Sequence, residues 1–285
     1  MAGCRHAPAG RADNREEILI IRVLLAALLF VPSFVAAIEP LAPVDGDFGA
    51  RAWGGVFNPA MYEMRRDVDG ENGLLSALSW KGGAASSSLT MGPQAGLELL
   101  WGILPDVRIV LSAEARGVSN KGAYKGSGAG SGGTASKDLF LSSYGGETGV
   151  IIMLREFDER SRISLDLRGG AHTLSGARES WSESGPLGKG SWTSSLSGVA
   201  PGALVGIDWE YSFVNRNDSF VPGAFLVAGY RFLSFTRVEY RYHDSTGMKK
   251  SGSVRDAAGE RISIDMSGPE IRLGIQLAIP TKIRG

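Results

Sequence analysis

Alternation of apolar and polar residues is the feature of this sequence that most restricts its fold. In residues 105–118, PDVRIVLSAEARGV, every second residue from Val107 to Ala115 is apolar, and Arg108, Glu114 and Arg116 stand between or beside them. A period of two is typical of a β-strand with two unlike faces. The same pattern recurs at 94–103, 161–172, 203–213, 236–242 and 270–279, and less regularly at 49–57 and 146–154. The chain is therefore expected to be all-β.

The connections between these segments are of two kinds. Short, turn-like connections lie at 104–106, 156–161 and 215–218, and long, polar connections rich in Gly and Ser lie near 67–88, 117–137, 176–198 and 243–267. Because long and short connections alternate, the pattern predicts an antiparallel up-and-down transmembrane β-barrel of eight strands with all long loops at one end. The segment 219–242 exceeds the roughly 9–11 residues of one crossing. A break near Leu233–Ser234 would give ten strands.

The charged residues indicate which face points inward. On the polar parity, eight acids nearly balance seven bases, and all of these bases are arginine. The planar guanidinium can hold carboxylates in a narrow lumen that little water reaches. We therefore predict a lumen network of Glu98, Arg108, Glu114, Arg116, Glu147, Asp166, Arg168, Asp208, Glu210, Arg231, Arg237, Glu239, Arg241, Glu270 and Arg272. An eight-stranded barrel is just wide enough for side chains to fill it, so a wide pore is not expected.

The apolar parity is then expected to face lipid. Aromatic residues on that parity lie toward the strand ends, as in the girdles at membrane–water interfaces. The predicted girdle consists of Trp101, Trp209, Tyr211, Tyr230, Tyr240 and Tyr242.

On this pattern, residues 48–280 resemble the small OmpA-type and opacity-protein-like bacterial outer-membrane barrels. The chain departs from that family at its end, where IRLGIQLAIP is followed by TKIRG rather than by a terminal aromatic residue. The resemblance implies location in a bacterial outer membrane, with membrane lipid and the barrel-assembly machinery as partners. A host or surface ligand is expected at the four long loops.

The N-terminal residues predict export. Four arginines precede the apolar run VLLAALLFVPSFV, which is followed by small residues. This is the order of a secretory signal peptide, and the run is shorter than the roughly 20 residues of a membrane-spanning helix. We expect a signal peptide at 1–37, a short periplasmic lead at 38–47 and the barrel at 48–285.

Composition argues against several functional classes. The 285 residues carry a formal net charge of +0, which does not favour nucleic-acid binding. Cys4 is the only cysteine, so no disulfide and no cysteine-based metal cluster are expected. His6, His172 and His243 are widely spaced outside any ligand motif. We expect no metal and no cofactor.

One segment suggests catalysis. In YRYHDSTGMKK (240–250), His243 and Ser245, together with Glu260, resemble the His-x-Ser-Asn motif and downstream Glu of outer-membrane lipid A 3-O-deacylases, although Thr246 replaces the Asn. The resemblance implies a serine nucleophile with histidine as its base. We predict instead a structural or surface-interaction role without enzymatic activity. A lipid A deacylase, a narrow channel and a soluble periplasmic ligand-binding barrel remain the alternatives.

Overall fold

The computed structural model describes residues 47–84, 89–104, 106–126, 133–185, 188–215, 219–255 and 261–280. The predicted signal peptide at 1–37, nearly all of the periplasmic lead and Glu260 lie outside these residues.

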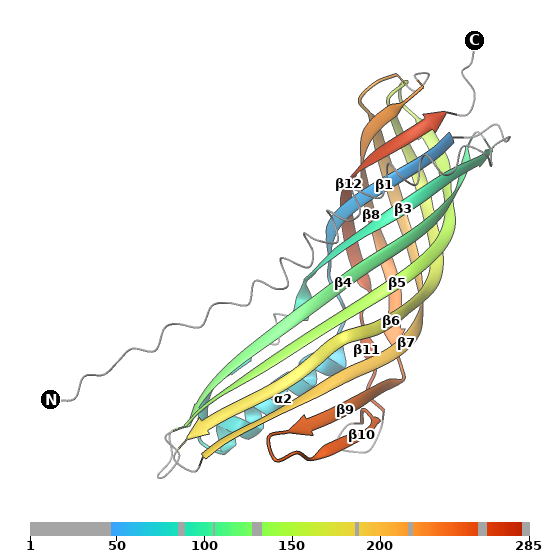
Figure 1. The fold of residues 1–285 in the computed structure, drawn as a ribbon. Coiled ribbons are helices and arrows are strands. Elements are labelled where there is room, and N and C mark those ends of the chain that lie inside the picture. Colours follow the sequence, from blue (N-terminus) through green and yellow to red (C-terminus); the bar gives the residue numbers. More distant parts are fainter. Residues whose placement is uncertain are drawn as a thin grey trace. The chain divides into compact units, whose positions relative to one another are not determined.

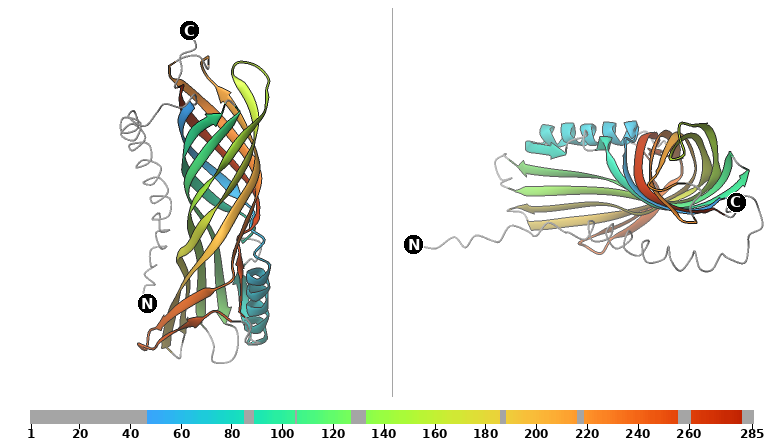
Figure 2. Two further views of the ribbon diagram at one scale, coloured as in Figure 1. Left: turned by 90° about the vertical axis from the view of Figure 1, so that its right-hand side faces the viewer. Right: turned by 90° about the horizontal axis from the view of Figure 1, so that it is seen from above.

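Eight antiparallel strands close into a barrel (Figures 1 and 2). They are β1 (Asp47–Phe57), β3 (Gly92–Leu104), β4 (Val107–Gly126), β5 (Thr134–Glu156), β6 (Ser161–Gly185), β7 (Gly188–Ser212), β8 (Val221–Phe235) and β12 (Gly268–Pro280). Each strand pairs with the next in this order, and β12 pairs with β1 to close the ring. The predicted up-and-down barrel is confirmed with eight strands.

Short connections join β3 to β4, β5 to β6 and β7 to β8 at one end of the barrel, which we call the turn end. In the β5–β6 turn, Asp158 Oδ1 accepts hydrogen bonds from the backbone N–H groups of Arg160 and Ser161, both at 2.7 Å. This use of an aspartate side chain to fix a turn is common, because it satisfies backbone donors that the strands leave free. The short connections of the sequence therefore lie where they were expected.

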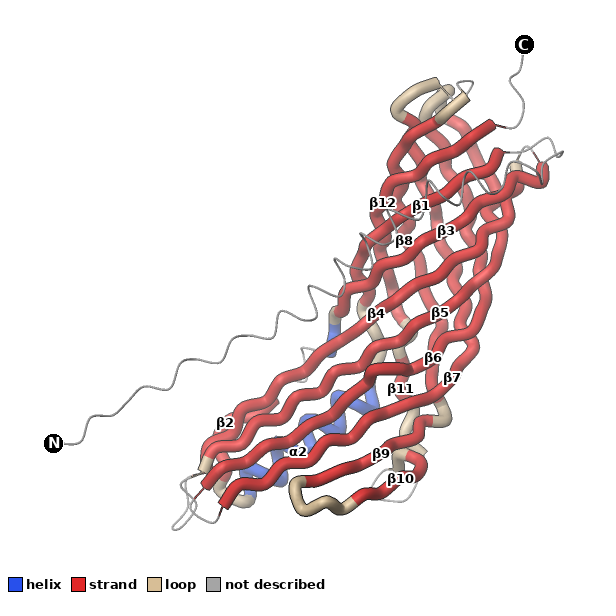
Figure 3. Tube along the Cα trace, in the orientation of Figure 1, coloured by secondary structure: helices blue, strands red, loops and turns tan. Residues whose placement is uncertain are grey.

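The long connections are different from the prediction. Strands β4 to β7 have 20 to 25 residues each and run far beyond one membrane crossing (Figure 3). Much of 117–137 and 176–198, expected as loops, is regular strand. We call this far part of the four strands, residues 117–126, 134–143, 174–185 and 188–198, the extension.

Further elements are attached to the extension. Most of the expected loop 67–88 is ordered, with helix α2 (Tyr62–Ala77) and β2 (Trp80–Ala84), and β2 pairs with β4. Asn72 joins helix to strand, because its side chain donates to the Ala84 carbonyl at 2.8 Å and accepts from the Ala84 N–H at 3.1 Å. Among the described residues, no helix is long and apolar enough to span a membrane.

The segment between β8 and β12 explains the long stretch 219–242. Strand β8 ends at Phe235, and β9 (Val238–Asp244) pairs with Trp192–Gly198 of β7. Strands β9 and β10 (Lys249–Ser253) form a hairpin outside the eight-stranded ring, and β11 (Ile264–Asp265) pairs with β8. The expected loop 243–267 therefore contains parts of three strands.

An apolar core fills the junction between the barrel and the extension. Its buried residues include Phe57 and Met61 before α2, Val68 on α2, Phe235 at the end of β8 and Val238 on β9. Burial of such side chains stabilises by about 1.5–3 kcal/mol each. This core explains why Gly- and Ser-rich sequence forms ordered strands here.

Candidate functional site: the barrel interior and the extension

The outside of the barrel is apolar. Large apolar side chains point outward with substantial exposure, for example Ile207 at 45% and Leu273 at 62%. Aromatic residues lie at both ends of this band. Trp101, Phe157, Trp209, Phe213 and Phe220 are exposed near the turn end, and Tyr144, Tyr230 and Phe232 toward the extension.

The height of this band matches a membrane. From Phe220 to Phe232, at about 3.3 Å per residue and a tilt of about 40°, the strand rises roughly 30 Å, about the hydrocarbon thickness of a bilayer. Water would not stabilise so much exposed apolar surface, whereas lipid does. The apolar band is therefore the membrane-spanning surface.

The predicted girdle is placed in part. Trp101, Trp209 and Tyr230 are exposed at the edges of the band, and the half-buried Tyr211 ring lies 6.4 Å from that of Trp209. The prediction was wrong for Tyr240 and Tyr242. Both lie on β9, which belongs to the extension, and both side chains are only partly exposed there.

The interior is polar and balanced in charge. Among the described residues, seven arginines and seven carboxylates are buried inside the barrel: Arg51, Arg108, Arg116, Arg162, Arg168, Arg231, Arg272, Glu98, Glu114, Glu147, Asp166, Asp208, Glu210 and Glu270. Twelve of these residues were in the predicted network. Arg51 was missed because glycines interrupt the alternation of its strand, GARAWGGVF. Arg162 was missed because it lies beside a turn, although it has the polar parity.

Near the turn end, three arginines converge on one carboxylate. Glu210 accepts ion pairs from Arg51 at 2.5 Å, Arg108 at 2.9 Å and Arg162 at 2.5 Å. Arg51 also binds Asp208 at 2.7 Å. Charge-assisted contacts of this length are the strong class of hydrogen bond.

Glu98 connects this group with the rest of the network. It pairs with Arg168 at 2.5 Å and lies 3.6 Å from Arg51 and 3.5 Å from Arg272. Arg168 in turn binds Asp166 at 2.5 Å. The ion pairs therefore form one connected set along the barrel.

A second group lies toward the extension. Arg231 contacts three carboxylates, those of Glu114 at 3.0 Å, Glu270 at 3.0 Å and Glu147. Arg272 binds Glu270 at 2.6 Å and Glu114 at 3.0 Å. Glu147 differs from the other two carboxylates, because His172 is its only other ionic partner among the described residues.

The network fills the middle of the barrel. The side chains of Arg51, Arg168, Arg231 and Arg272 have a relative exposure of 0%. The guanidinium of Arg51 also stacks on Phe225, at 4.2 Å from the ring centre. Arginines and aromatic rings thus occupy the lumen together.

His172 is the one buried histidine of the described interior. Its Nε2 lies 2.9 Å from Glu147, and its Nδ1 lies 3.7 Å from Glu114. These three residues could together offer ligand atoms to a metal ion. Arg231 contacts both carboxylates, however. A cation would have to compete with this arginine, so the donor set does not favour a metal site.

Three residues of the predicted lumen network, Arg237, Glu239 and Arg241, do not line the lumen. They were predicted in the lumen, but all three are exposed, on β9 or directly before it. At the end of β8 the buried residues are Arg231, Leu233 and Phe235, whereas in β9 the buried residue is Val238. The chain thus gains one residue at the bend between the strands, and the two faces exchange.

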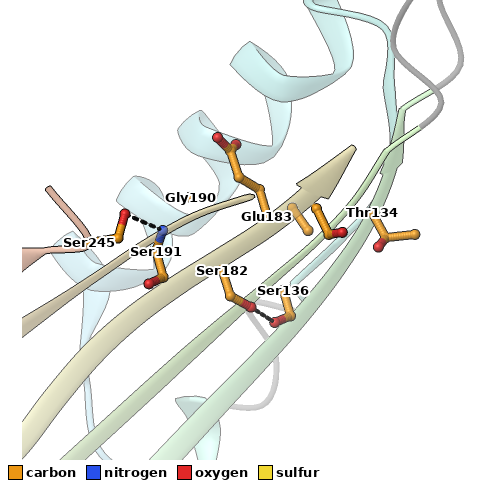
Figure 4. A pocket seen from close by; sticks show the side chains of 9 residues that line it. Thr134, Ser136, Ser182, Glu183, Gly190, Ser191 and Ser245 are labelled. Atoms are coloured by element: carbon orange, nitrogen blue, oxygen red, sulfur yellow. Dashed lines mark hydrogen bonds between the residues drawn. The ribbon is translucent and has the colours of Figure 1, made fainter. Parts of the chain in front are cut away.

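The described catalytic candidates His243 and Ser245 do not contact each other through a hydrogen bond, and Ser245 has other partners. Ser245 pairs with Ser191 of β7: the Ser191 N–H donates to Ser245 Oγ at 3.4 Å, and the Ser245 N–H donates to the Ser191 carbonyl at 2.8 Å (Figure 4). Among the described residues, no hydrogen bond joins His243 to Ser245. Ser245 instead borders an open hollow of about 490 Å³ lined by other hydroxyl groups, such as those of Ser136 and Ser182.

A buried lysine ties α2 to the extension. Lys137 on β5 contacts Glu71 of α2 and binds Glu179 of β6 at 2.8 Å. Burial opposes the ammonium charge, but the two carboxylates outweigh it and raise the pKa of Lys137 above its ordinary value. Close by, the Trp181 ring lies 5.5 Å from that of Tyr124, so this tryptophan packs on the extension.

A closed barrel of even strand number, with an apolar exterior between two aromatic girdles and a polar interior, is the architecture of a bacterial outer-membrane β-barrel. The fold and its surface define this class without reference to any relative. No family model matches the sequence, and no curated protein matches it.

Solved structures of the same class are similar in fold. A major outer membrane protein from Thermus thermophilus has a TM-score of 0.44 at 12% identity, over 82% of this chain and 98% of that one. CarO of Acinetobacter baumannii gives 0.33 at 13% identity, over 83% and 97%. Ail, the attachment invasion locus protein of Yersinia pestis, in complex with the heparin analogue sucrose octasulfate, gives 0.30 at 12%, over 83% and 100%.

Proposed function

We propose that this protein is a structural, surface-interacting outer-membrane barrel with a closed lumen, and that its extension is the part that meets external partners. The observation that carries the proposal is the contrast between the two halves. The interior arginines and carboxylates pair with one another at almost no exposure, whereas the extension is a large ordered surface beyond the apolar band. Short turns on the periplasmic side and long segments outside are the arrangement of this class.

The closed lumen argues against a channel. Opening a water path would separate buried ion pairs, at several kcal/mol for each charge left without a partner. We expect the purified, heat-modifiable protein to show no unitary conductance in planar lipid bilayers. Discrete, reproducible conductance steps would overturn this part of the proposal.

The orientation can be tested by labelling. With Cys4 replaced by Ser, Ser182→Cys in the extension and Glu159→Cys in the β5–β6 turn give two matched reporters on exposed residues. A membrane-impermeant maleimide should label Ser182→Cys in intact cells, and Glu159→Cys only after the outer membrane is opened. The reverse pattern would place the extension in the periplasm.

The proposal assigns external ligands to the extension and no catalytic step to His243 or Ser245. The contacts of Ser245 with the Ser191 backbone support a structural part for it. We expect Ser245→Ala to leave the masses of cellular lipid A unchanged relative to wild type. A lipid A species that depends on Ser245 would instead establish a hydrolase.

A further inference from the structure

The exposed residues Arg237 and Glu239 border a groove at the base of the extension. This groove has a volume of about 610 Å³ and is lined from β6, β7, β9 and β10. Its lining includes Arg237 and Arg261, with hydroxyl groups from Thr173, Ser197 and Ser253.

The groove begins at the edge of the membrane band. Val199, one of its lining residues, is 71% exposed and pairs with Thr173, which in turn pairs with the girdle residue Tyr144. Along β7 from Val199 toward the turn end, the outward residues Val205 and Ile207 belong to the apolar band. One end of the groove is therefore level with acyl chains, and the other is level with polar headgroups.

The charge of the groove favours an anion. Arg237 and Arg261 are exposed, and neither forms an ion pair with another described residue. Glu239 is the one carboxylate of the described lining, so the two guanidinium groups leave one positive charge in excess. Arg241 follows Glu239 by two residues on the same exposed face of β9. The buried arginines of the described interior all face carboxylates, which makes these outer ones distinct.

We propose that this groove binds the phosphate-bearing headgroup of a lipid of the adjacent leaflet. The forked guanidinium groups of Arg237 and Arg261 bind phosphate oxygens in two-point contacts. The hydroxyls of Ser197 and Ser253 donate to the remaining polar atoms, and an acyl chain runs along Val199 into the apolar band. The inference rests on the proposed function, because it needs a membrane at this height.

The test uses the full-length mature protein, purified in neutral detergent and shown to be folded by its heat-modifiable gel mobility. Binding of diphosphoryl lipid A is measured by native mass spectrometry, with dephosphorylated lipid A and inorganic phosphate as separate probes. The double variant Arg237→Gln/Arg261→Gln is compared with Lys121→Gln/Lys125→Gln, which removes the same charge from exposed positions on the far part of β4.

We expect wild type and the lysine variant to retain diphosphoryl lipid A equally. The arginine variant should bind about tenfold or more weakly for each lost guanidinium, since a hydrogen bond to a charged group contributes about 1.5–3 kcal/mol. Equal binding by both variants, or equal binding of dephosphorylated lipid A, would overturn the proposal. Binding of inorganic phosphate as tight as that of the lipid would show an anion site without lipid recognition, and would also overturn it. Failure of the wild type to fold as a heat-modifiable barrel would refute the proposed function instead.

Discussion

Replacement of Arg231 by Met should destabilise the barrel more than any exposed arginine substitution. Methionine retains most of the side-chain volume, so the loss is mainly electrostatic. Arg231 and its three carboxylate partners have side-chain exposures of 0–1%. Removing one partner of a buried pair costs about 3–5 kcal/mol, because the other charge stays buried without compensation. The unfolding equilibrium should therefore shift by roughly a hundredfold or more.

The contacts also predict where this cost arises. After loss of Arg231, Glu114 still binds Arg116 and Arg272, whereas the one remaining ionic contact of Glu147 within 4 Å among the described residues is His172. Adding Glu147→Gln to Arg231→Met should therefore restore much of the lost stability. Adding Glu114→Gln should restore little, because the remaining arginines would then lose a partner.

Urea unfolding of the protein in lipid vesicles, followed by tryptophan fluorescence and by gel mobility of unheated samples, measures these differences. Arg241→Met, on the exposed face of β9, is the matched control and should stay within about 0.5 kcal/mol of wild type. The reasoning is refuted if Arg231→Met equals this control. Equal rescue by the two glutamine substitutions would refute the assignment of the cost to Glu147.

Two further outcomes follow from local geometry. Gly145→Ala should impair folding, because its Cβ would overlap the His172 ring, whereas Gly146→Ala meets its nearest atom at 3.9 Å and should be tolerated; yields of heat-modifiable protein compare the two. The raised pKa of Lys137 means that its stabilisation is complete below the unfolded value of about 10.4 and is lost as pH rises through the higher folded value. Limited proteolysis of the extension should therefore accelerate above this pH in wild type, and Lys137→Met should be cleaved faster at neutral pH with a weaker pH dependence. A pH profile identical in both proteins would contradict this.

The membrane part of the fold could be predicted from the sequence because period two is a property of each strand by itself. A strand such as 107–115 shows both faces directly, with Ile109 and Leu111 on one and Arg108 and Glu114 on the other. The chemistry of arginine in a confined space then indicated which of the two faces lines the lumen. The partners of each arginine could not be predicted, because they depend on how neighbouring strands are shifted in register.

The extension could not be predicted, because its order comes from contacts far apart in the chain. Residues 117–126 and 176–185 are rich in small polar residues, which locally favour loops. They form strands because each pairs with a neighbour along its length, and because Val68 of α2 joins the apolar core at the junction. Strand propensity depends strongly on such surroundings. The helix itself has an ordinary polar composition that gave no signal.

The exchange of faces between β8 and β9 shows that odd and even residue numbers predict the inward face only while the pairing with the neighbouring strand keeps one register. Arg231 and Arg237 are both odd-numbered, and a continuous strand would point both inward. Along β7, however, Gly202 pairs with Leu233 and Gly198 pairs with Val238. The β8–β9 side therefore holds one residue more than β7 over this stretch, which is the arrangement of a β-bulge. Arg231 precedes this extra residue and keeps its place among three buried carboxylates, whereas Arg237 follows it and is exposed.

The same exchange predicts which of two neighbouring residues supports the extension. Val238 is buried in the apolar core, whereas Arg237 is exposed. Val238→Asp would place a carboxylate among the apolar side chains of the core, and such burial is costly. Limited proteolysis should therefore cleave the extension of Val238→Asp much faster than that of wild type, while Arg237→Asp, which introduces the same side chain one residue earlier, should behave like wild type. If Arg237→Asp were the more sensitive of the two, Arg237 rather than Val238 would point inward, and the lumen network would continue into β9.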